Sequence, residues 1–272
     1  MHTAMEQEAV LNVVESFFAG ISSRRPPFVA ARELIIPDAF CVFSHLDELW
    51  VNRLDKTMDR IESKVHAAMG SIKEFREELT QPGPEIWVSG DLAAVWTGHQ
   101  TLIDGNRVAQ SIKLISLHKT ATGWKICGVA DSQQVWGCKV LKEAEPEMLE
   151  RIYAMCKSVA DYHWDSTMTF CLTGGGKTSS RRHGEGLVSS TWPEMMENAK
   201  EPPVGKTEST AMTDIEVRVC GGFAFAWTTF VIQHDGGTTE RIVAAITLLK
   251  DAGKWLITGC QDTSLSLAKG SE

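Results

Sequence analysis

Apolar and polar positions recur in the same order twice along this chain. The stretch from Glu85 to Asp131 aligns without a gap with the stretch from Glu216 to Asp262, at a constant offset of 131 residues. Roughly a third of the aligned positions are identical, and the matches include a tryptophan and an Asp-Gly pair in register. We infer that the sequence arose by an internal duplication.

Each copy has the pattern of strands joined by tight turns. In the first copy an apolar run ends at Asp104-Gly105, a dipeptide that favours a hairpin because both residues tolerate positive φ. A second run covers residues 111–119, and a third opens on Trp124. The pattern predicts a three-stranded antiparallel meander in each half, with Trp124 or Trp255 closing one end of a core.

Helical spacing precedes each meander. Apolar residues recur every three to four positions, which predicts helices, and short apolar runs predict strands. The Gly-rich stretch 174–178 does not fit a phosphate-binding loop, because the required first glycine is Cys171, and it is predicted to be a flexible loop. The predicted helices are 7–23, 29–34, 57–79 (with a candidate break at Gly70-Ser71, after which Ser71 and Glu74 resemble a capping box for the second piece), 146–163 and 192–198, and the predicted short strands are 40–44 and 168–172.

Helices followed by long strands in both halves indicate an α+β fold. We predict two tandem domains, 1–140 and 141–272, each a curved antiparallel sheet wrapped by its N-terminal helices. The strands around 93–96 and 223–227 are nearly continuously apolar, as expected when both faces of a sheet are covered. We therefore expect the two meanders to pack face to face as an intramolecular pseudo-dimer, and further homo-oligomerisation stays open.

Composition excludes several classes of partner. A formal net charge of −8 disfavours nucleic acid and anionic membranes, which bind basic surfaces. No apolar run is long enough to cross a bilayer, and the acidic N-terminus is unlike a signal peptide, so a cytoplasmic location is expected. The seven cysteines lack the spacing of a metal site. Cys127, Cys171, Cys220 and Cys260 lie in apolar runs and are expected to be buried thiols.

The order of elements, a Gly-Asp-Leu-Ala-x-Val-Trp strand at 90–96, the Asp-Gly hairpin and a closing strand from Gly123 to Ser132 together resemble the nuclear transport factor 2-like superfamily. Within it, the chain is most similar to SnoaL-like proteins and the lumazine-binding group. The resemblance implies a cone-shaped sheet around an apolar pocket. Such proteins include polyketide cyclases, ketosteroid isomerases, dehydratases, epoxide hydrolases and non-catalytic members, so the fold does not give the activity.

The resemblance directs attention to ionisable and aromatic residues on the predicted strands. We take His45, His99 and Asp131 as candidate catalytic residues, because buried acid-base groups can transfer protons near neutral pH. The alternatives are hydrogen-bonded core histidines and a strand-end aspartate with a structural role. The second copy has Phe230 in place of His99, so a catalytic His99 would make only the first half active at that point.

Further residues are candidates for substrate binding, each with a structural alternative such as core packing. They are Trp96, Trp227, Tyr162 and Asp262. Neither a cofactor nor a metal is predicted. With only Tyr153 and Tyr162 in the chain, an oxyanion hole built on tyrosine is disfavoured.

Two functions from different classes follow. The first is a cofactor-independent cyclase, isomerase or dehydratase that acts by acid-base chemistry on a small apolar metabolite of secondary metabolism. The alternative is a small-molecule-binding or assembly protein without catalysis.

Overall fold

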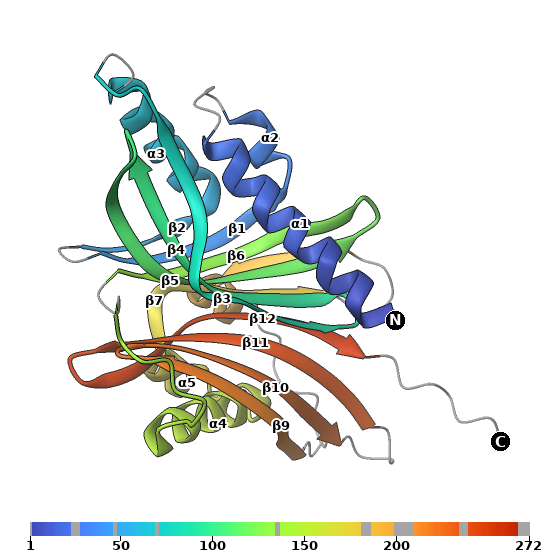
Figure 1. The fold of residues 1–272 in the computed structure, drawn as a ribbon. Coiled ribbons are helices and arrows are strands. Elements are labelled where there is room, and N and C mark those ends of the chain that lie inside the picture. The colour runs from blue at the N-terminus through green and yellow to red at the C-terminus, as the bar shows by residue number, and fades with distance from the viewer. Residues whose placement is uncertain are drawn as a thin grey trace. The chain divides into compact units, whose positions relative to one another are not determined.

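The computed structural model describes residues 2–22, 28–45, 48–68, 71–133, 137–180, 186–198, 209–233 and 239–265. The chain divides into two compact units, Met1–Cys138 and Lys139–Glu272. Each unit is a bent six-stranded sheet with helices, as Figure 1 shows, so the predicted α+β class is confirmed. The predicted packing of the two meanders against each other stays a prediction.

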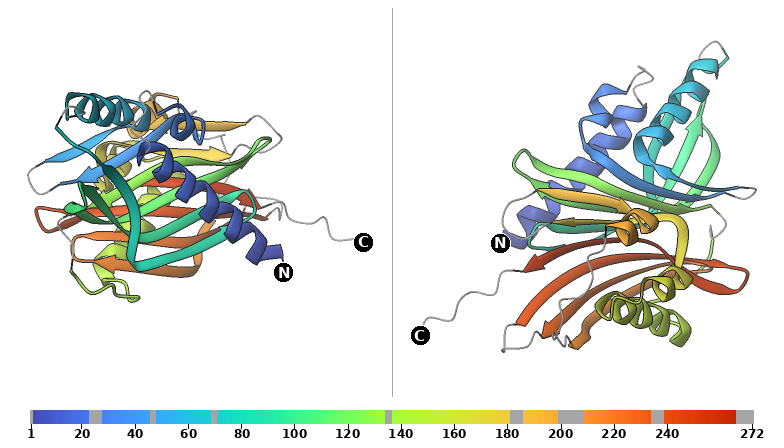
Figure 2. Two further views of the ribbon diagram at one scale, coloured as in Figure 1. Left: turned by 45° about the horizontal axis from the view of Figure 1, so that its top comes forward. Right: turned by 180° about the vertical axis from the view of Figure 1, so that it is seen from behind.

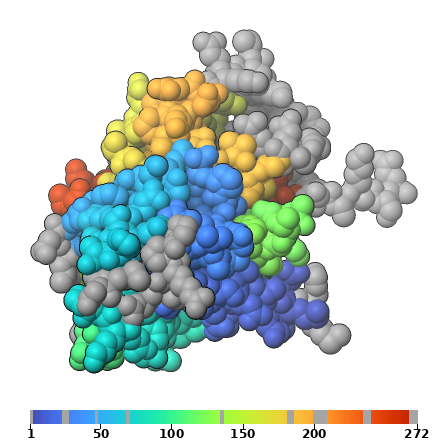
Figure 3. All heavy atoms as spheres, turned by 90° about the horizontal axis from the view of Figure 1, so that it is seen from above, coloured from blue at the N-terminus to red at the C-terminus, as the bar shows by residue number. Residues whose placement is uncertain are grey.

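The first unit has the sheet order β2-β1-β6-β5-β4-β3. Figure 2 shows that this sheet is strongly curved and that α1 crosses its hollow side. The space-filling view shows the blue and cyan side chains of the first unit, which include those of α1 and α3, on one face (Figure 3). The elements are α1 (His2–Ser22), α2 (Val29–Arg32), β1 (Ile35–Ser44), β2 (Leu49–Arg53), α3 (Leu54–Ala68), β3 (Phe75–Ser89), β4 (Leu92–Ile103), β5 (Asn106–Thr120) and β6 (Gly123–Ser132).

The second unit repeats this plan, with the sheet order β8-β7-β12-β11-β10-β9. Its strands correspond one by one to those of the first unit, as the duplication predicts. The elements are α4 (Pro146–Ala160), α5 (Trp164–Phe170), β7 (Cys171–Ser180), β8 (Leu187–Thr191), α6 (Trp192–Glu197), β9 (Ser209–Cys220), β10 (Phe223–Gln233), β11 (Thr239–Asp251) and β12 (Lys254–Leu265).

Residues that are identical in both halves hold the first helix of each unit to its sheet. In the first unit Glu6 accepts hydrogen bonds from Lys119 Nζ at 2.8 Å and from Trp124 Nε1 at 2.9 Å. In the second unit Glu145, just before α4, accepts the same two bonds from Lys250 at 2.8 Å and Trp255 at 3.0 Å. Both tryptophans are buried. The repeated lysine and tryptophan are therefore part of the scaffold.

The sheets are mixed and not purely antiparallel, which corrects the prediction. β1 runs parallel to β6, with Phe43 opposite Asp131, and β7 runs parallel to β12. The alternation of residues along a strand sets which face each side chain occupies, but it does not identify the neighbouring strand. A parallel pair needs a long crossover, and the whole segment from β2 to β5 provides it.

The meander of each unit has four strands instead of the predicted three. The stretch that begins at Glu85 turns back at Gly90-Asp91 and so contributes to both β3 and β4. Gly90 and its counterpart Gly221 both have φ of 57°, a conformation that glycine adopts without steric cost. The predicted hairpin at Asp104-Gly105 is present, with φ of 50° and 76°.

The predicted helix 57–79 was too long. α3 ends at Ala68, and residues from Phe75 onward form β3 at the edge of the sheet. No helix begins at Ser71, so the second helical piece with its capping box is not present. Instead, the Asp104 carboxylate accepts hydrogen bonds from the backbone N–H groups of Lys73 at 2.6 Å and Glu74 at 2.7 Å. A side chain distant in sequence thus fixes the start of β3.

The Gly-rich stretch 174–178 lies in β7 and is not a flexible loop. A Cβ atom on Gly175 would lie 2.3 Å from the Thr258 carbonyl oxygen and 2.8 Å from the Trp192 indole nitrogen. Only glycine leaves room for this approach, which buries Trp192 in the core of the second unit. In the same region the predicted strand 168–172 begins only at Cys171, because α5 extends to Phe170.

Candidate functional site

A cavity of about 170 Å3 lies inside the first unit, between the sheet and the helices α1 and α3. This is several times the roughly 30 Å3 that one water occupies in the liquid, and it is small beside the roughly 300–1,000 Å3 of most ligand sites. The cavity has an apolar wall and a polar one. Apolar lining residues include Phe17, Phe18, Ile21, Phe43, Trp50, Leu54, Met58 and Val129, and polar ones include His45, Thr57, Glu77, His99, Thr101, Ser111, Lys113 and Asp131.

The alternation of side chains along the strands places the polar residues on one wall of the cavity. His99 and Thr101 lie two residues apart on β4, and Ser111 and Lys113 lie two residues apart on β5, so the two side chains of each pair point to the same face of the sheet. The register places His99 opposite Ser111 and Lys113 opposite Asp131. Neighbouring strands therefore bring these side chains together on the inner face.

Lys113 and Asp131 form a buried ion pair. Lys113 Nζ lies 2.5 Å from Asp131 Oδ2, and the two side chains are 9% and 4% exposed. The ammonium also lies 5.1 Å from the centre of the Phe43 ring. Asp131 Oδ1 is buried and has no hydrogen-bond partner among the described residues. One oxygen of this cavity-lining carboxylate therefore accepts no hydrogen bond from the described residues.

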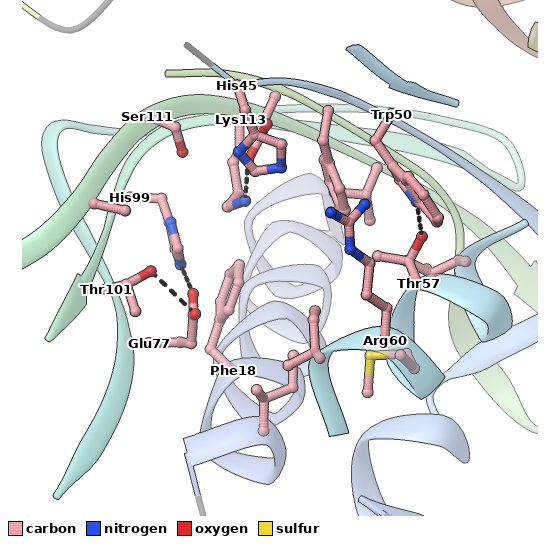
Figure 4. Close-up of a pocket in the computed structure, with 18 of the residues that line it drawn as sticks. Phe18, His45, Trp50, Thr57, Arg60, Glu77, His99, Thr101, Ser111 and Lys113 are labelled. Carbon is pink, nitrogen blue, oxygen red and sulfur yellow. Dashed lines mark hydrogen bonds and ion pairs between the residues drawn. The ribbon is translucent and has the colours of Figure 1, made fainter. Parts of the chain in front are cut away.

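Glu77 and His99 form a second buried pair. The His99 Nε2 atom contacts the Glu77 carboxylate, and the side chains are 5% and 14% exposed, respectively. Thr101 Oγ1 donates a hydrogen bond of 3.0 Å to the other oxygen of Glu77. The ring of Phe18 packs against the imidazole, with 4.9 Å between ring centres. Figure 4 shows Glu77, His99 and Thr101 together on one side of the cavity.

The surroundings of this pair set its protonation. Burial, and then the charge of Lys113, lower the pKa of His99 below its usual 6.5, so the imidazole is neutral at pH 7. Burial alone would raise the pKa of Glu77, but His99, Lys113 and Thr101 outweigh it, and the carboxyl has a lowered pKa. Because Nε2 is the ring nitrogen that contacts the Glu77 carboxylate, we assign the proton of the neutral imidazole to Nε2, which leaves the lone pair on Nδ1.

Three predicted residues lie in this one cavity. His99 and Asp131 belong to the two buried pairs, and His45 lines the cavity at the end of β1, 6.1 Å from the Phe43 ring (Figure 4). Trp96 is fully buried on β4 and lies three residues before His99. Because successive side chains of a strand point to opposite faces, Trp96 lies on the face opposite to His99. Trp96 therefore does not line this cavity.

The remaining predicted residues belong to the second unit. Trp227 is buried on β10, and Tyr162 lies in the turn after α4, where its ring packs edge-on against Trp164. Asp262 Oδ2 lies 2.6 Å from Lys177 Nζ. These three residues do not join the cavity of the first unit.

Sequence reasoning missed Glu77 and Lys113. Glu77 fell within the stretch that was predicted as helix, because Phe-Arg-Glu-Glu-Leu has helical spacing. Lys113 offered a usable signal: it is a charged residue in the middle of an apolar strand, and its offset from Ser111 places both on one face. A lysine in that position needs a buried partner.

The second unit has apolar residues at the matching positions. Phe230, Ile242, Ala244 and Cys260 stand where the first unit has His99, Ser111, Lys113 and Val129. These residues belong to or pack against the apolar core of the second unit. Asp262 alone is retained, and its cation comes from β7 instead of the strand that corresponds to β5. The acid-base groups other than this aspartate are thus specific to the first unit.

Comparisons with known proteins give structural similarity only. No protein-family model and no curated protein sequence matches the chain. One similar structure is a candidate dehydratase of the NTF2-like family from Streptomyces avermitilis, with 16% identity, a TM-score of 0.39, and coverage of 48% of this chain and 97% of the other.

Two further structures are similar over about half of this chain. An NTF2-like protein with a cystatin-like fold from Novosphingobium aromaticivorans has 13% identity and a TM-score of 0.41, and covers 50% of this chain and 86% of its own. The CaMKII hub of S. rosetta has 21% identity and a TM-score of 0.37, with coverage of 45% and 99%.

None of the helices in the described ranges is long and apolar enough to span a membrane. Across those same ranges, no three His, Cys, Asp or Glu side chains group in a way that could hold a metal ion.

Proposed function

We propose that the first unit is a cofactor-independent lyase or isomerase that moves a proton at a carbon next to a carbonyl group of a small substrate. The observation that carries this proposal is that two buried acid-base pairs, Glu77–His99 and Lys113–Asp131, line one small cavity. Buried charges are costly, and ionisable groups concentrated in a cavity are a common mark of a reactive site.

His99 is the proposed general base. Glu77 orients the imidazole through Nε2–H, as a third group orients the base in catalytic triads. Because burial and Lys113 lower its pKa, His99 has its lone pair available at neutral pH. The proton leaves the substrate carbon and binds Nδ1, and the C–H bonding electrons delocalise onto the carbonyl oxygen.

Lys113 is the proposed stabiliser of that oxygen. An ammonium group has three donors, and one of them is directed at Asp131. A second donor can bind the developing enolate, and in a buried site such an interaction is strong. The open Oδ1 of Asp131 can accept a hydrogen bond from a substrate hydroxyl.

Two reactions can follow the removal of the proton, and both conserve atoms. Return of the proton from His99 to another carbon gives isomerisation. Transfer of the proton to a β-hydroxyl releases water and gives dehydration. Both need only the proton that His99 removed, which agrees with a site that is proposed to use no cofactor.

The test uses hydrogen exchange, which needs no knowledge of the product. Small ketones and hydroxyketones are incubated with the full-length protein in D2O, and deuterium entering next to the carbonyl is followed by proton NMR. His99→Gln is expected to slow the exchange by about a hundredfold or more, because it removes the base.

The chain supplies its own control. Asp131→Asn is expected to reduce exchange, whereas Asp262→Asn removes the matching carboxylate of the second unit and is expected to leave exchange unchanged. If ligands bind but neither exchange nor product formation occurs, the unit is a binding protein and the catalytic proposal fails. If His99→Gln retains full activity, His99 is not the base and the proposed mechanism fails.

A further inference from the structure

A second group of charged residues lies at the edge of the same cavity. It comprises His45 at the end of β1 and Arg60 and Lys64, which lie one turn apart on α3. We call these three residues the basic rim. All three line the cavity, and none belongs to the two acid-base pairs described above.

Arg60 is held in place from two sides. Its Nη1 and Nη2 atoms donate to the two Glu48 carboxylate oxygens at 3.2 and 2.8 Å. Its guanidinium carbon lies 4.1 Å from the centre of the Trp50 ring, and Trp50 Nε1 donates to Thr57 Oγ1 at 2.8 Å. The side chain is still 32% exposed. Arg60 is therefore preorganised, and it keeps N–H donors that Glu48 does not use.

Among the residues that the structure describes, the rim carries more positive than negative charge. Hydrogen bonds from Arg60 lower the pKa of Glu48, and the charges of Arg60, His45 and Lys64 add to this effect. One carboxylate thus faces two permanent cations and a histidine. Deeper in the cavity the charges are different, because Glu77 and Asp131 would repel an anion and Asp131 already neutralises Lys113. A permanently anionic group of a ligand is therefore favoured at the rim over the far wall, where Lys113 has a donor left only for the oxygen that becomes charged during the reaction.

We propose that the basic rim binds a carboxylate of the substrate, with Arg60 as the main contact, so that the substrate is a small carboxylic acid whose reactive end reaches Lys113 and His99. This inference rests on the proposed function for the identity of the reactive end. Figure 4 shows Arg60 and Trp50 on one side of the cavity and His99 and Glu77 on the other. A molecule that spans the cavity would contact both groups.

Two features favour a carboxylate over a larger anion. The planar guanidinium already binds a carboxylate of the chain itself, Glu48, in the two-point geometry that suits arginine. The cavity of about 170 Å3 leaves little space for a bulky anionic group together with the rest of a substrate. The apolar wall, with Phe18 and Trp50, fits the carbon body of such an acid.

The experiment compares each acid with its neutral amide. Binding of benzoate, benzamide, hexanoate, hexanamide and phenyl phosphate to the full-length protein is measured by isothermal titration calorimetry. At least one carboxylate is expected to bind roughly tenfold or more tightly than its amide, as for a hydrogen bond to a charged group. Arg60→Gln is expected to remove this preference and leave amide binding nearly unchanged.

Arg32 is the matched control. Its guanidinium contacts Asp59 at 2.8 Å and Glu62 at 3.0 Å, so it is also tied to α3, but it does not line the cavity. Arg32→Gln is expected to keep the carboxylate preference. The proposal is overturned if neither carboxylate binds better than its amide, if Arg60→Gln keeps the preference, if Arg32→Gln loses it equally, or if phenyl phosphate binds more tightly than benzoate.

Binding and turnover separate the two proposals. His99→Gln is expected to keep the carboxylate preference while hydrogen exchange is lost. If exchange survives in His99→Gln but Arg60→Gln loses the preference, the catalytic proposal fails and the rim inference stands. If His99→Gln loses exchange and Arg60→Gln keeps the carboxylate preference, the catalytic proposal stands and the rim inference fails.

Discussion

The ion pair between Lys113 and Asp131 gives a quantitative test of how the first unit is built. Replacing Lys113 by Met leaves the Asp131 carboxylate without its cation in a site where that side chain is 4% exposed. Removing one partner of a buried pair typically costs about 3–5 kcal/mol, because the remaining charge is no longer compensated. We expect Lys113→Met and Asp131→Asn each to lower the free energy of unfolding by about 3 kcal/mol.

The double variant distinguishes a charge effect from lost packing. With both charges absent, no uncompensated ion remains, so Lys113→Met/Asp131→Asn is expected to cost about as much as either single change instead of about twice as much. Urea unfolding of the full-length protein, followed by tryptophan fluorescence, measures the four free energies of the cycle.

The second unit again supplies the comparison. Lys177 is 31% exposed and Asp262 is 10% exposed, so water compensates the remaining carboxylate in part, and Lys177→Met is expected to cost less than Lys113→Met. The reasoning would be refuted if the double variant costs the sum of the two single variants Lys113→Met and Asp131→Asn to within about 0.5 kcal/mol. An equal loss for Lys177→Met and Lys113→Met would refute it as well.

Three further predictions concern pH, packing and domain independence. The pKa of His99 is lowered in the folded protein, so as the pH falls below 6.5 the unfolded chain binds a proton before the folded one does. The free energy of unfolding should therefore decline from pH 6.5 down to the pKa of His99 in the folded protein. Urea unfolding midpoints measured at a series of pH values should show this decline, and His99→Gln should make it smaller. Gly175→Ala should destabilise strongly, since its Cβ would lie 2.3 Å from a carbonyl oxygen, whereas Gly105→Ala, at φ of 76° in open space, should cost only about 1 kcal/mol; comparable thermal unfolding of both variants would contradict this. If the predicted packing of the two meanders is right, the full-length chain should unfold in one transition, and fragments 1–140 and 141–272 should fold poorly alone; two soluble, cooperatively melting monomers would disprove it.

The duplication made the fold predictable and hid part of the site. Identical positions such as Trp124 and Trp255 hold the scaffold, where each indole bonds the glutamate of the first helix. These repeated positions therefore predict the strands of the sheet correctly. The acid-base groups lie where the copies differ, as at His99 and Phe230, and repeated residues do not reveal them.

Two site residues show what local pattern cannot give. Glu77 lies on an edge strand whose polar sequence has helical spacing, and only the pairing of β3 with β4 places it beside His99. Arg60 looks like an ordinary helix surface residue in sequence. Its role depends on the approach of Trp50 and Glu48, which follows from how α3 packs beside β2.

The strand-end aspartate obtains its cation from β5 in one copy and from β7 in the other, and this constrains how the two halves diverged. Register places Cys41 in the first unit where the second has Lys177, and the alignment places Ala244 where the first has Lys113. A lineage that lost one lysine before gaining the other would have passed through an ancestor with a bare buried carboxylate. The less costly order gains the new lysine first, because a half with both lysines never has the buried carboxylate unpaired. Building that intermediate in the first unit, by adding Cys41→Lys before Lys113→Ala, tests whether a half can exchange one lysine for the other and stay folded.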